Sequence, residues 1–360
     1  LSDDQSDRPV AQSVQSPQVV TLLLSSKNLS LPQKVLAGHY LREQLALRLD
    51  CPLSEVWWVW GGIGLSFVFE RAVHHRLVAA AWQQIGQVST NSFRRCRSRA
   101  AETIRQWSQQ VAPMLLWRAR FSCLGHSEQD WDETKTLGLP ISDFEESLRD
   151  LLTQTPVTVL SDEGGDQVIG APKFRHHLLF VKAQRREVRL QTTRRGHWLS
   201  WTATSLRAPL GYLIHSLIGQ GLTGLWIGIF REKPPLAYEV SASWHLHPIS
   251  GEVYLYAAGK PEDLPLIQSE GRRLIDALRR GVITSQDLER AKQLALNRWV
   301  LLQSHPVERG KMVSAWLAAG YRLEEFRSLP ETILSFGVAD LKQAFKTAPI
   351  VFSEYTVLPE

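Results

Sequence analysis

Residues 219–238 read GQGLTGLWIGIFREKPPLAY, and this stretch is the most informative in the chain. It joins a glycine-rich turn to Arg231 and Tyr238, and the tyrosine opens a predicted strand, Tyr238–Trp244. A guanidinium that is always charged and a phenol, held near each other, can stabilise a polarised carbonyl from two sides. The pattern predicts a pair that assists a reaction at a carbonyl without supplying the metal or the nucleophile.

The composition is that of a globular protein with two or three domains. Of the 360 residues, 44% are hydrophobic and 21% are charged, and the net charge of +5 points only weakly to acidic partners. The thirteen tryptophans are expected in the core and between domains. Cys51, Cys96 and Cys123 are widely spaced, which favours a reducing compartment, hence a cytoplasmic location, with the periplasm as the alternative.

The ends and the apolar stretches of the chain carry no targeting signal. The stretch Ile218–Phe230 is too short to span a bilayer, so we expect no membrane association. The first 18 residues, LSDDQSDRPVAQSVQSPQ, are polar and lack both a signal-peptide layout and an initiator Met. We therefore expect the chain to begin inside a longer gene product, although processing could equally remove a start.

Two units with one plan are expected. A polar lead covers 1–16, the first unit covers 17–165, and the second covers 172–360, after a linker at Gly170–Pro172. Each unit offers a strand, a helix, a hairpin around glycine, several helices and a final strand. This order indicates a loose duplication of class α+β, with helices packed on a mixed sheet in each unit.

Hydrophobic periodicity and capping patterns place the elements. Ser142 with Glu145 and Thr284 with Asp287 have the spacing of capping boxes. Pro113 is expected to break a helix over 99–116, and 127–135 is expected to be an exposed loop. Other predicted helices are 76–85, 262–280, 284–303, 307–319 and 338–345. Predicted strands are 19–24, 56–60, 65–69, 157–160, 177–181, 187–191, 198–201, 238–244, 252–257 and 350–352.

The glycines at 219, 221 and 224 match a dinucleotide-binding fingerprint on paper. That chemistry needs the glycines to leave a strand and open a helix, so that the helix N-terminus meets the pyrophosphate. Here they follow a helical run with no strand before them. We interpret Gly219, Gly221 and Gly224 as a close-packed turn.

The eleven histidines contain neither HExxH nor the inverted HxxEH. His39 and Glu43 are one helical turn apart, and His245 and His247 share one face of a strand. Each pair lacks a third ligand, so ordinary polar residues are favoured over a metal site. We expect no catalytic metal in this chain.

Two basic clusters, Arg94–Arg99 and Arg185–Arg186, could hold phosphates. No nucleic-acid motif with stacking aromatics accompanies them, so a solvated helix start or a patch for an acidic peptide is favoured and no nucleic-acid partner is expected. For Arg231 and Tyr238, spacing alone favours a surface arginine and a half-buried strand tyrosine.

The second unit resembles the second half of the M16 zinc peptidases, the pitrilysin and insulin-degrading enzyme superfamily. The resemblance rests on Gln220–Gly224 followed by Phe230–Val240, where "LRE…LAY" is the family pattern, and on Glu252–Ala257 and Ile283–Lys292. The terminal segment Val338-Ala-Asp-Leu is also similar. The likeness is specific over 210–300.

The first unit resembles the third domain of the same family more faintly. Gln33–Arg48, Trp57–Trp60, Gly61–Phe69 and Phe93–Leu124 follow the expected order. The short, tryptophan-rich half is similar to the protease of pyrroloquinoline quinone biosynthesis.

The resemblance implies four homologous α+β domains in two halves that close like a clamshell. The HxxEH motif and its Zn²⁺ would lie in a partner half, and this chain would be the C-terminal, non-catalytic half. Arg231 and Tyr238 would take the family's roles of contacting the peptide substrate and stabilising the transition state, with Gly221 and Gly224 in the adjoining substrate-binding turn. An inactive M16-fold scaffold or assembly subunit is the alternative, and a basic-patch nucleic-acid binder is a third interpretation.

Overall fold

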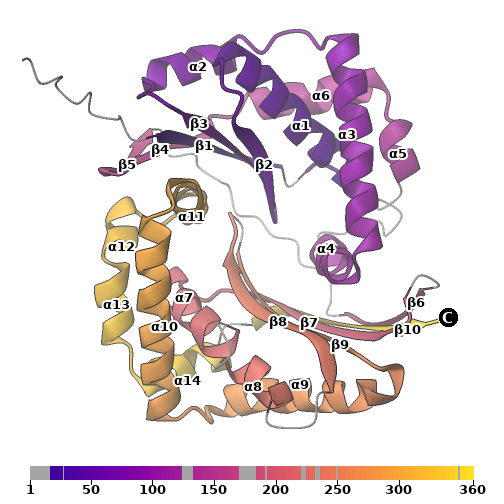
Figure 1. Ribbon diagram of the computed structural model, residues 1–360, viewed down its shortest axis with the longest axis vertical. Coiled ribbons are helices and arrows are strands. Elements are labelled where there is room, and N and C mark those ends of the chain that lie inside the picture. Colours follow the sequence, from indigo (N-terminus) through magenta and orange to yellow (C-terminus); the bar gives the residue numbers. More distant parts are fainter. Residues whose placement is uncertain are drawn as a thin grey trace, which may run out of the picture.

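The chain forms two units, each a five-stranded sheet covered by helices (Figure 1). The computed structural model describes residues 17–26, 28–123, 133–169, 184–190, 193–219, 224–231, 236–248, 250–347 and 349–360. Within these ranges the strands of the first sheet come from 18–169 and those of the second from 184–359. The domain ranges 17–165 and 172–360 stay predictions, because 170–183 lie outside the described residues.

The first sheet, sheet A, is antiparallel throughout. Its order is β2 (Ser54–Val59), β3 (Gly62–Phe69), β1 (Gln18–Ser25), β4 (Val157–Asp162) and β5 (Gly165–Ile169). A mixed sheet was expected, and for this unit that expectation is wrong. The tight turn between β4 and β5 makes the last two strands a hairpin, which can pair only in antiparallel fashion.

The second sheet, sheet B, is mixed as predicted. Its order is β6 (Gln184–Leu190), β10 (Pro349–Pro359), β7 (Gly196–Thr204), β9 (Gly251–Gly259) and β8 (Ala237–Leu246). The pair of β6 and β10 is parallel and the other pairs are antiparallel. The closing strand predicted over 350–352 forms part of β10, which is much longer than predicted.

The two sheets repeat one strand order, which supports the predicted duplication. In each, the first hairpin (β2–β3 or β8–β9) pairs with an earlier strand (β1 or β7), whose other neighbour is the last long strand (β4 or β10). Only the outermost strand differs, because β5 follows β4 whereas β6 precedes β7. The two units therefore share a four-strand core arrangement.

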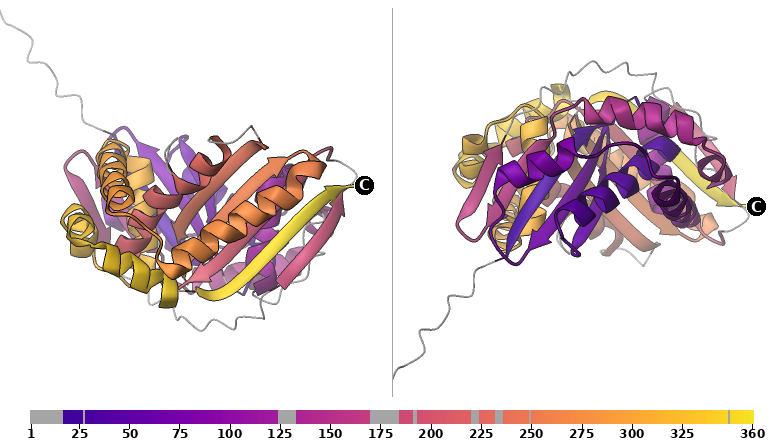
Figure 2. Two further views of the ribbon diagram at one scale, coloured as in Figure 1. Left: turned by 90° about the horizontal axis from the view of Figure 1, so that it is seen from below. Right: turned by 90° about the horizontal axis from the view of Figure 1, so that it is seen from above.

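Helices cover the outer face of each sheet. The first unit has α1 (Leu31–Arg48), α2 (His75–Gln83), α3 (Thr90–Gln109), α4 (Val111–Cys123), α5 (Glu133–Leu137) and α6 (Ile141–Leu152). The second has α7 (Ala208–Ile218), α8 (Leu225–Arg231), a 3₁₀ turn (Pro261–Asp263), α9 (Leu264–Arg280), α10 (Ser285–Gln303), α11 (Pro306–Ala318), α12 (Leu323–Arg327), α13 (Leu329–Ser335) and α14 (Val338–Thr347). Seen from below in Figure 2, α9 runs across the outer face of sheet B.

Two helices cross between the units (Figure 1). Helix α11 packs on β1 and β4 of sheet A, while α4 packs on β7 and β10 of sheet B. The backbone of α11 comes so close that a Cβ added to Gly310 would lie 2.5 Å from Thr21 Oγ1. Each sheet is thus covered on its inner face by a helix of the other unit.

Several helix boundaries differ from the sequence prediction. The structure has α3 ending at Gln109 and α4 beginning at Val111, and Pro113 lies in the first turn of α4, where a missing N–H costs no intrahelical bond. Helix α6 begins after Pro140 without a side-chain cap, so the predicted Ser142–Glu145 capping box is wrong. The box of Thr284 and Asp287 is confirmed. The predicted strand over 177–181 and residues 127–132 of the predicted loop lie outside the described residues, whereas 133–135 belong to helix α5 and not to a loop.

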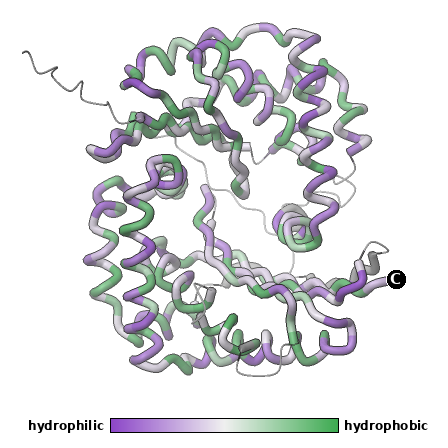
Figure 3. The backbone as a smooth tube through the Cα atoms, in the orientation of Figure 1, coloured by the Kyte–Doolittle hydropathy of each residue, from purple (hydrophilic) through white to green (hydrophobic). Residues whose placement is uncertain are grey.

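The tryptophans fill the core as expected, several of them against a glycine. Trp60, Trp198, Trp201, Trp226 and Trp316 are fully buried. A Cβ on Gly38 of α1 would lie 2.4 Å from the ring of Trp58, and a Cβ on Gly211 of α7 would lie 2.1 Å from that of Trp244. The strands of sheet A are largely hydrophobic, whereas the outer helices carry mixed residues (Figure 3).

Candidate functional site

Tyr238 lies near the start of β8, the outermost strand of sheet B at the side away from β6. Ala237 pairs with Gly259 and Glu239 with Ala258, so Tyr238 is an extra residue at a β-bulge. Bulges redirect a side chain from the regular alternation of a strand. The Tyr238 side chain is exposed, with 59% of its surface accessible, and is available to a ligand.

Arg195 lies over the exposed ring of Tyr238. The guanidinium carbon is 5.3 Å from the ring centroid, within the range of a cation–π contact. Arg195 immediately precedes β7, the strand on the far side of β9 from β8. Sequence reasoning missed this arginine because no local spacing links it to Tyr238, and only the strand order brings the two together.

The predicted partner, Arg231, is the last residue of α8. Its side chain lies outside the described part of the structure, so the Arg231–Tyr238 pair stays a prediction. The apolar stretch that precedes it, Leu225–Phe230, is helical. The glycine turn therefore connects two helices before the chain enters β8.

Gly219 packs tightly on β8, and Gly224 packs on the end of α7. A Cβ on Gly219 would lie 1.8 Å from the carbonyl oxygen of Ala242, so only glycine fits there. A Cβ on Gly224 would lie 2.9 Å from the carbonyl oxygen of Ile218. Gly221 lies outside the described residues. Gly219 follows α7 rather than a strand, which agrees with a packed turn and not with a dinucleotide fingerprint.

Helix α7 covers the middle of the β8 edge. The backbone N–H of Trp244 donates to His215 Nδ1 at 3.3 Å, and Ser243 Oγ lies 2.6 Å from the same nitrogen. Because Nδ1 accepts from the backbone, the Ser243 hydroxyl is the donor of the second bond. This part of the edge is not free to pair with a peptide, whereas Tyr238 and Glu239 are exposed.

The histidines named as candidate ligands are occupied by other contacts. His247 Nδ1 accepts from the backbone N–H of Trp60 at 3.1 Å, and its Nε2 lies 3.1 Å from Glu252 Oε1. His39 Nε2 bonds Thr103 Oγ1 at 2.9 Å. Within the described residues, no three His, Cys, Asp or Glu side chains are placed to share a metal ion.

Burial keeps these histidines neutral. It lowers the pKa of His245 and of His215 to about 3, in the case of His215 with help from the charge of Arg298. It also lowers the pKa of His39 to about 4. Glu43, the other half of the His39 pair, is bound by Arg95 at 2.8 Å and by Arg99 at 3.0 Å.

A buried polar network joins the units at the opposite end of β8 and β9 from Tyr238, where Glu252 pairs with His245. Glu252 of β9 accepts from both Arg120 Nε and Arg120 Nη2, the first at 2.8 Å, and from Trp201 Nε1 at 2.8 Å. Burial alone would raise the pKa of Glu252, but the charge and the hydrogen bonds of Arg120 hold it well below its ordinary value. The carboxylate is therefore ionised and fixes α4 to sheet B.

The second crossing helix has a similar arginine. Arg309 of α11 is buried, and its Nε donates to Asp166 Oδ1 at 3.0 Å while Nη1 donates to the carbonyl oxygen of Gln303 at 2.6 Å. Its Nη2 donates to the carbonyl oxygen of Asp162. Each crossing helix is thus held to the opposite sheet by one buried arginine.

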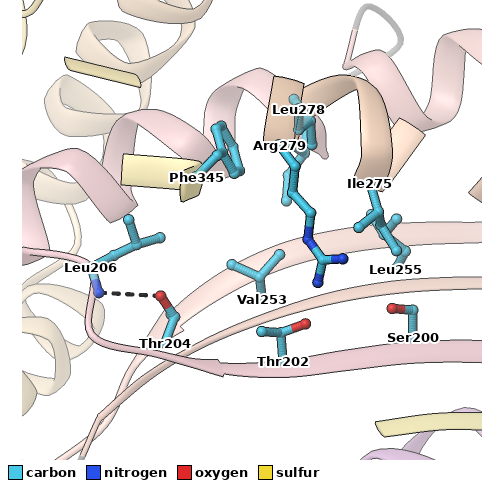
Figure 4. A pocket seen from close by; sticks show the side chains of 11 residues that line it. Ser200, Thr202, Thr204, Leu206, Val253, Leu255, Ile275, Leu278, Arg279 and Phe345 are labelled. Carbon is cyan, nitrogen blue, oxygen red and sulfur yellow. Dashed lines mark hydrogen bonds between the residues drawn. The ribbon is translucent and has the colours of Figure 1, made fainter. Parts of the chain in front are cut away.

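A small cavity lies on the outer face of sheet B, away from Tyr238 (Figure 4). Thr202, Val253, Leu278 and Phe345 line it, and the side chain of Arg279 points into it. Its volume of about 60 Å³ holds a few water molecules at roughly 10–15 Å³ each. It is too small for a peptide and is separate from Tyr238.

None of the helices in the described ranges combines the length and the apolar character needed to cross a membrane. Cys51 and Cys96 are buried free thiols.

Neither protein-family profiles nor curated protein sequences match this chain. Several solved structures, by contrast, are similar to it. A protease from Helicobacter pylori aligns with a TM-score of 0.73 and 14% identity, over 95% of this chain and 94% of that one. An inactive peptidase M16 domain from Pseudomonas fluorescens gives 0.70 and 12%, over 97% and 94%.

A third similar structure is a longer protein. The periplasmic protease PqqL from Escherichia coli aligns with a TM-score of 0.66 and 13% identity, over 97% of this chain but 44% of that one. At these identities the likeness establishes the fold. The chain has the fold of the M16 peptidases.

Proposed function

We propose that this chain is the non-catalytic half of a clamshell zinc endopeptidase, which encloses and orients a peptide together with a zinc-bearing half. The observation that carries the proposal is the exposed Tyr238 at the bulge of β8, which follows the glycine turn and α8 in the M16-like pattern. The likeness to an inactive M16 domain over almost the whole chain supports it. The sequence contains no HxxEH, so the metal would belong to the partner.

The chain's own residues would act on the substrate carbonyl. Zn²⁺ bound in the partner half would supply an activated water. The Tyr238 hydroxyl would donate to the carbonyl oxygen as negative charge develops, and the Arg231 guanidinium would stabilise the same charge. Gly221 and Gly224 would keep the turn beside the peptide free of side chains. The peptide backbone would pair with β8 at its exposed start, because α7 covers residues 242–244.

The test is peptide hydrolysis by the chain mixed with an HxxEH-bearing half. Tyr238→Phe and Arg231→Ala should each lower kcat by about 100- to 1,000-fold, the usual effect of removing one donor to a developing oxyanion. Zinc content of the complex should not change. Arg290→Ala, at an exposed position on α10, is the matched control. Undiminished turnover in both site variants would overturn the role.

Two finer points belong to this proposal. The assignment to pyrroloquinoline quinone biosynthesis rests on the sequence resemblance, and PqqL is about twice as long as this chain. The proposed cytoplasmic location rests on the wide spacing of the three cysteines, of which the structure shows Cys51 and Cys96 as free thiols.

An assembly subunit without catalysis is the second candidate. It is favoured by the likeness to a chain of Complex III2 from Candida albicans, with a TM-score of 0.67 and 12% identity, over 96% of this chain and 91% of that one. This function predicts a stable complex with a partner whose assembly survives Tyr238→Phe and Arg231→Ala, and no peptide cleavage in any mixture. Size-exclusion chromatography with the hydrolysis assay separates the two.

A further inference from the structure

We propose that Arg195 is a positioning residue for Tyr238, holding the phenol ring in the orientation in which it meets the substrate. This inference rests on the proposed function of Tyr238. Arg195 lies outside the sequence pattern that singled out Arg231 and Tyr238, and the contact between its guanidinium and the tyrosine ring carries the inference.

Tyr238 needs an external contact to fix its ring. At the bulge its side chain leaves the regular packing of the sheet, and most of its surface is exposed. A tyrosine free to turn about its two side-chain torsions would spend only part of its time with the hydroxyl directed at a substrate carbonyl. A guanidinium over the ring face favours one orientation by electrostatic attraction to the ring quadrupole.

The turn before β7 fixes the backbone of Arg195. The backbone N–H of Arg195 donates to Thr193 Oγ1 at 3.2 Å. Thr193 Oγ1 also lies 2.8 Å from His197 Nε2, and His197 Nδ1 lies 2.9 Å from the hydroxyl of Tyr256. The turn that carries Arg195 is therefore anchored to two buried residues of the inner face of sheet B.

The same anchor reaches the strand that carries Tyr238. Burial and the negative charge of Glu239, the residue next to Tyr238, raise the pKa of the Tyr256 hydroxyl. Burial and the charge of Arg195 lower the pKa of His197 to about 4, so the imidazole is neutral at pH 7 and can link Thr193 to Tyr256 as one donor and one acceptor. The turn that carries Arg195 and the strand that carries Tyr238 thus both lie beside the buried side chains of His197 and Tyr256.

The first experiment separates positioning from binding by kinetics. The chain is combined with an HxxEH-bearing half, and hydrolysis of a fluorogenic peptide is measured for Arg195→Ala, Arg195→Lys and the control Arg194→Ala. A contact of this kind at an exposed site corresponds to about a two- to five-fold change in the population of the held ring. Arg195→Ala should lower kcat by about that factor with KM unchanged, Arg195→Lys should recover most of the loss, and Arg194→Ala should have no effect.

A double variant shows whether Arg195 acts through the tyrosine. With Tyr238→Ala in place, Arg195→Ala should cause no further loss. An equal loss in both backgrounds, or a change confined to KM, would show that Arg195 contacts the peptide on its own and would overturn the inference.

A second measurement needs no enzymatic activity. Tyr238 is replaced by 3-fluorotyrosine in the isolated chain, and the ¹⁹F resonance is compared between the parent, Arg195→Ala and Arg194→Ala. The resonance should move in Arg195→Ala and stay in place in Arg194→Ala. If it moves but no mixture cleaves peptide, the proposed function fails and the Arg195 contact stands. If it stays in place in Arg195→Ala, the positioning role is wrong whatever the activity.

Discussion

Strands β2 and β8 occupy the same outer position in the two sheets, yet only β8 presents a candidate site. In each unit the first helix packs on this strand, and a tryptophan of the strand lies against a glycine of the helix. Trp58 of β2 lies against Gly38 of α1, and Trp244 of β8 lies against Gly211 of α7. The pairing of β2 with β3 is regular from end to end, whereas β8 has one extra residue, Tyr238. The repeated packing builds the scaffold, and one inserted residue redirects a side chain to solvent. Three predictions test this comparison of the two units.

The largest expected effect comes from the buried pair that joins the units. Arg120→Ala leaves the ionised Glu252 buried without its main partner, which should lower the free energy of unfolding by about 3–5 kcal/mol. Urea unfolding measures the change. Arg95→Ala, which removes a largely exposed partner of Glu43, should cost about 0–1 kcal/mol. A loss as small for Arg120→Ala as for Arg95→Ala would mean that the units do not depend on this network.

The second effect is a difference in acid sensitivity between the units. In the second unit, desolvation lowers the pKa values of His197, His215 and His245 to about 4, 3 and 3 and also lowers that of His247, whereas in the first unit it lowers the pKa of His39 to about 4. Because these pKa values lie below that of an unfolded histidine, near 6.5, the unfolded state binds more protons between about pH 6.5 and 4. Stability is complete above pH 6.5 and falls with decreasing pH.

The size of this effect increases with the number of histidines whose pKa is lowered on folding. Each histidine that titrates only in the unfolded state contributes a slope of about 1.4 kcal/mol per pH unit. Hydrogen exchange measured at pH 7 and pH 5 should show a greater loss of protection in sheet B than in sheet A. His215→Gln should reduce the slope for the second unit. Equal losses in both sheets would contradict the comparison.

The smallest effect tests the matched glycines. Gly38→Ala and Gly211→Ala each place a methyl group within 2.4 Å of a tryptophan ring, and each should cost about 1–3 kcal/mol through displacement of that ring. Thermal unfolding measures both. Gly228→Ala in α8, where an added Cβ meets nothing within 4 Å, is the control and should stabilise by about 0.5–1 kcal/mol. Very different costs at Gly38 and Gly211 would show that the two edges are not packed alike.

Much of the local structure could be predicted from the sequence. The hairpin around Gly61, the capping box at Thr284 and the alternation of strands and helices in both units follow from short-range patterns. Tyr238 at the start of a strand was also predicted as part of a site, although its exposure and its bulge were not. These features depend on neighbours within a few positions, which a single sequence displays.

The long-range arrangement could not be predicted in this way. The exchange of α4 and α11 between the units, and the buried arginines that fix them, pair residues far apart in the chain.

The sequence by itself therefore indicated many of the helices and strands, the duplicated plan and Tyr238 as a candidate. Only the tertiary structure decided what surrounds that residue. Arg195 reaches Tyr238 because the strand order β7-β9-β8 brings the start of β7 beside the bulge of β8. The physical reason is that strand pairing joins segments through backbone hydrogen bonds available to every residue, so the local sequence does not record which strands become neighbours.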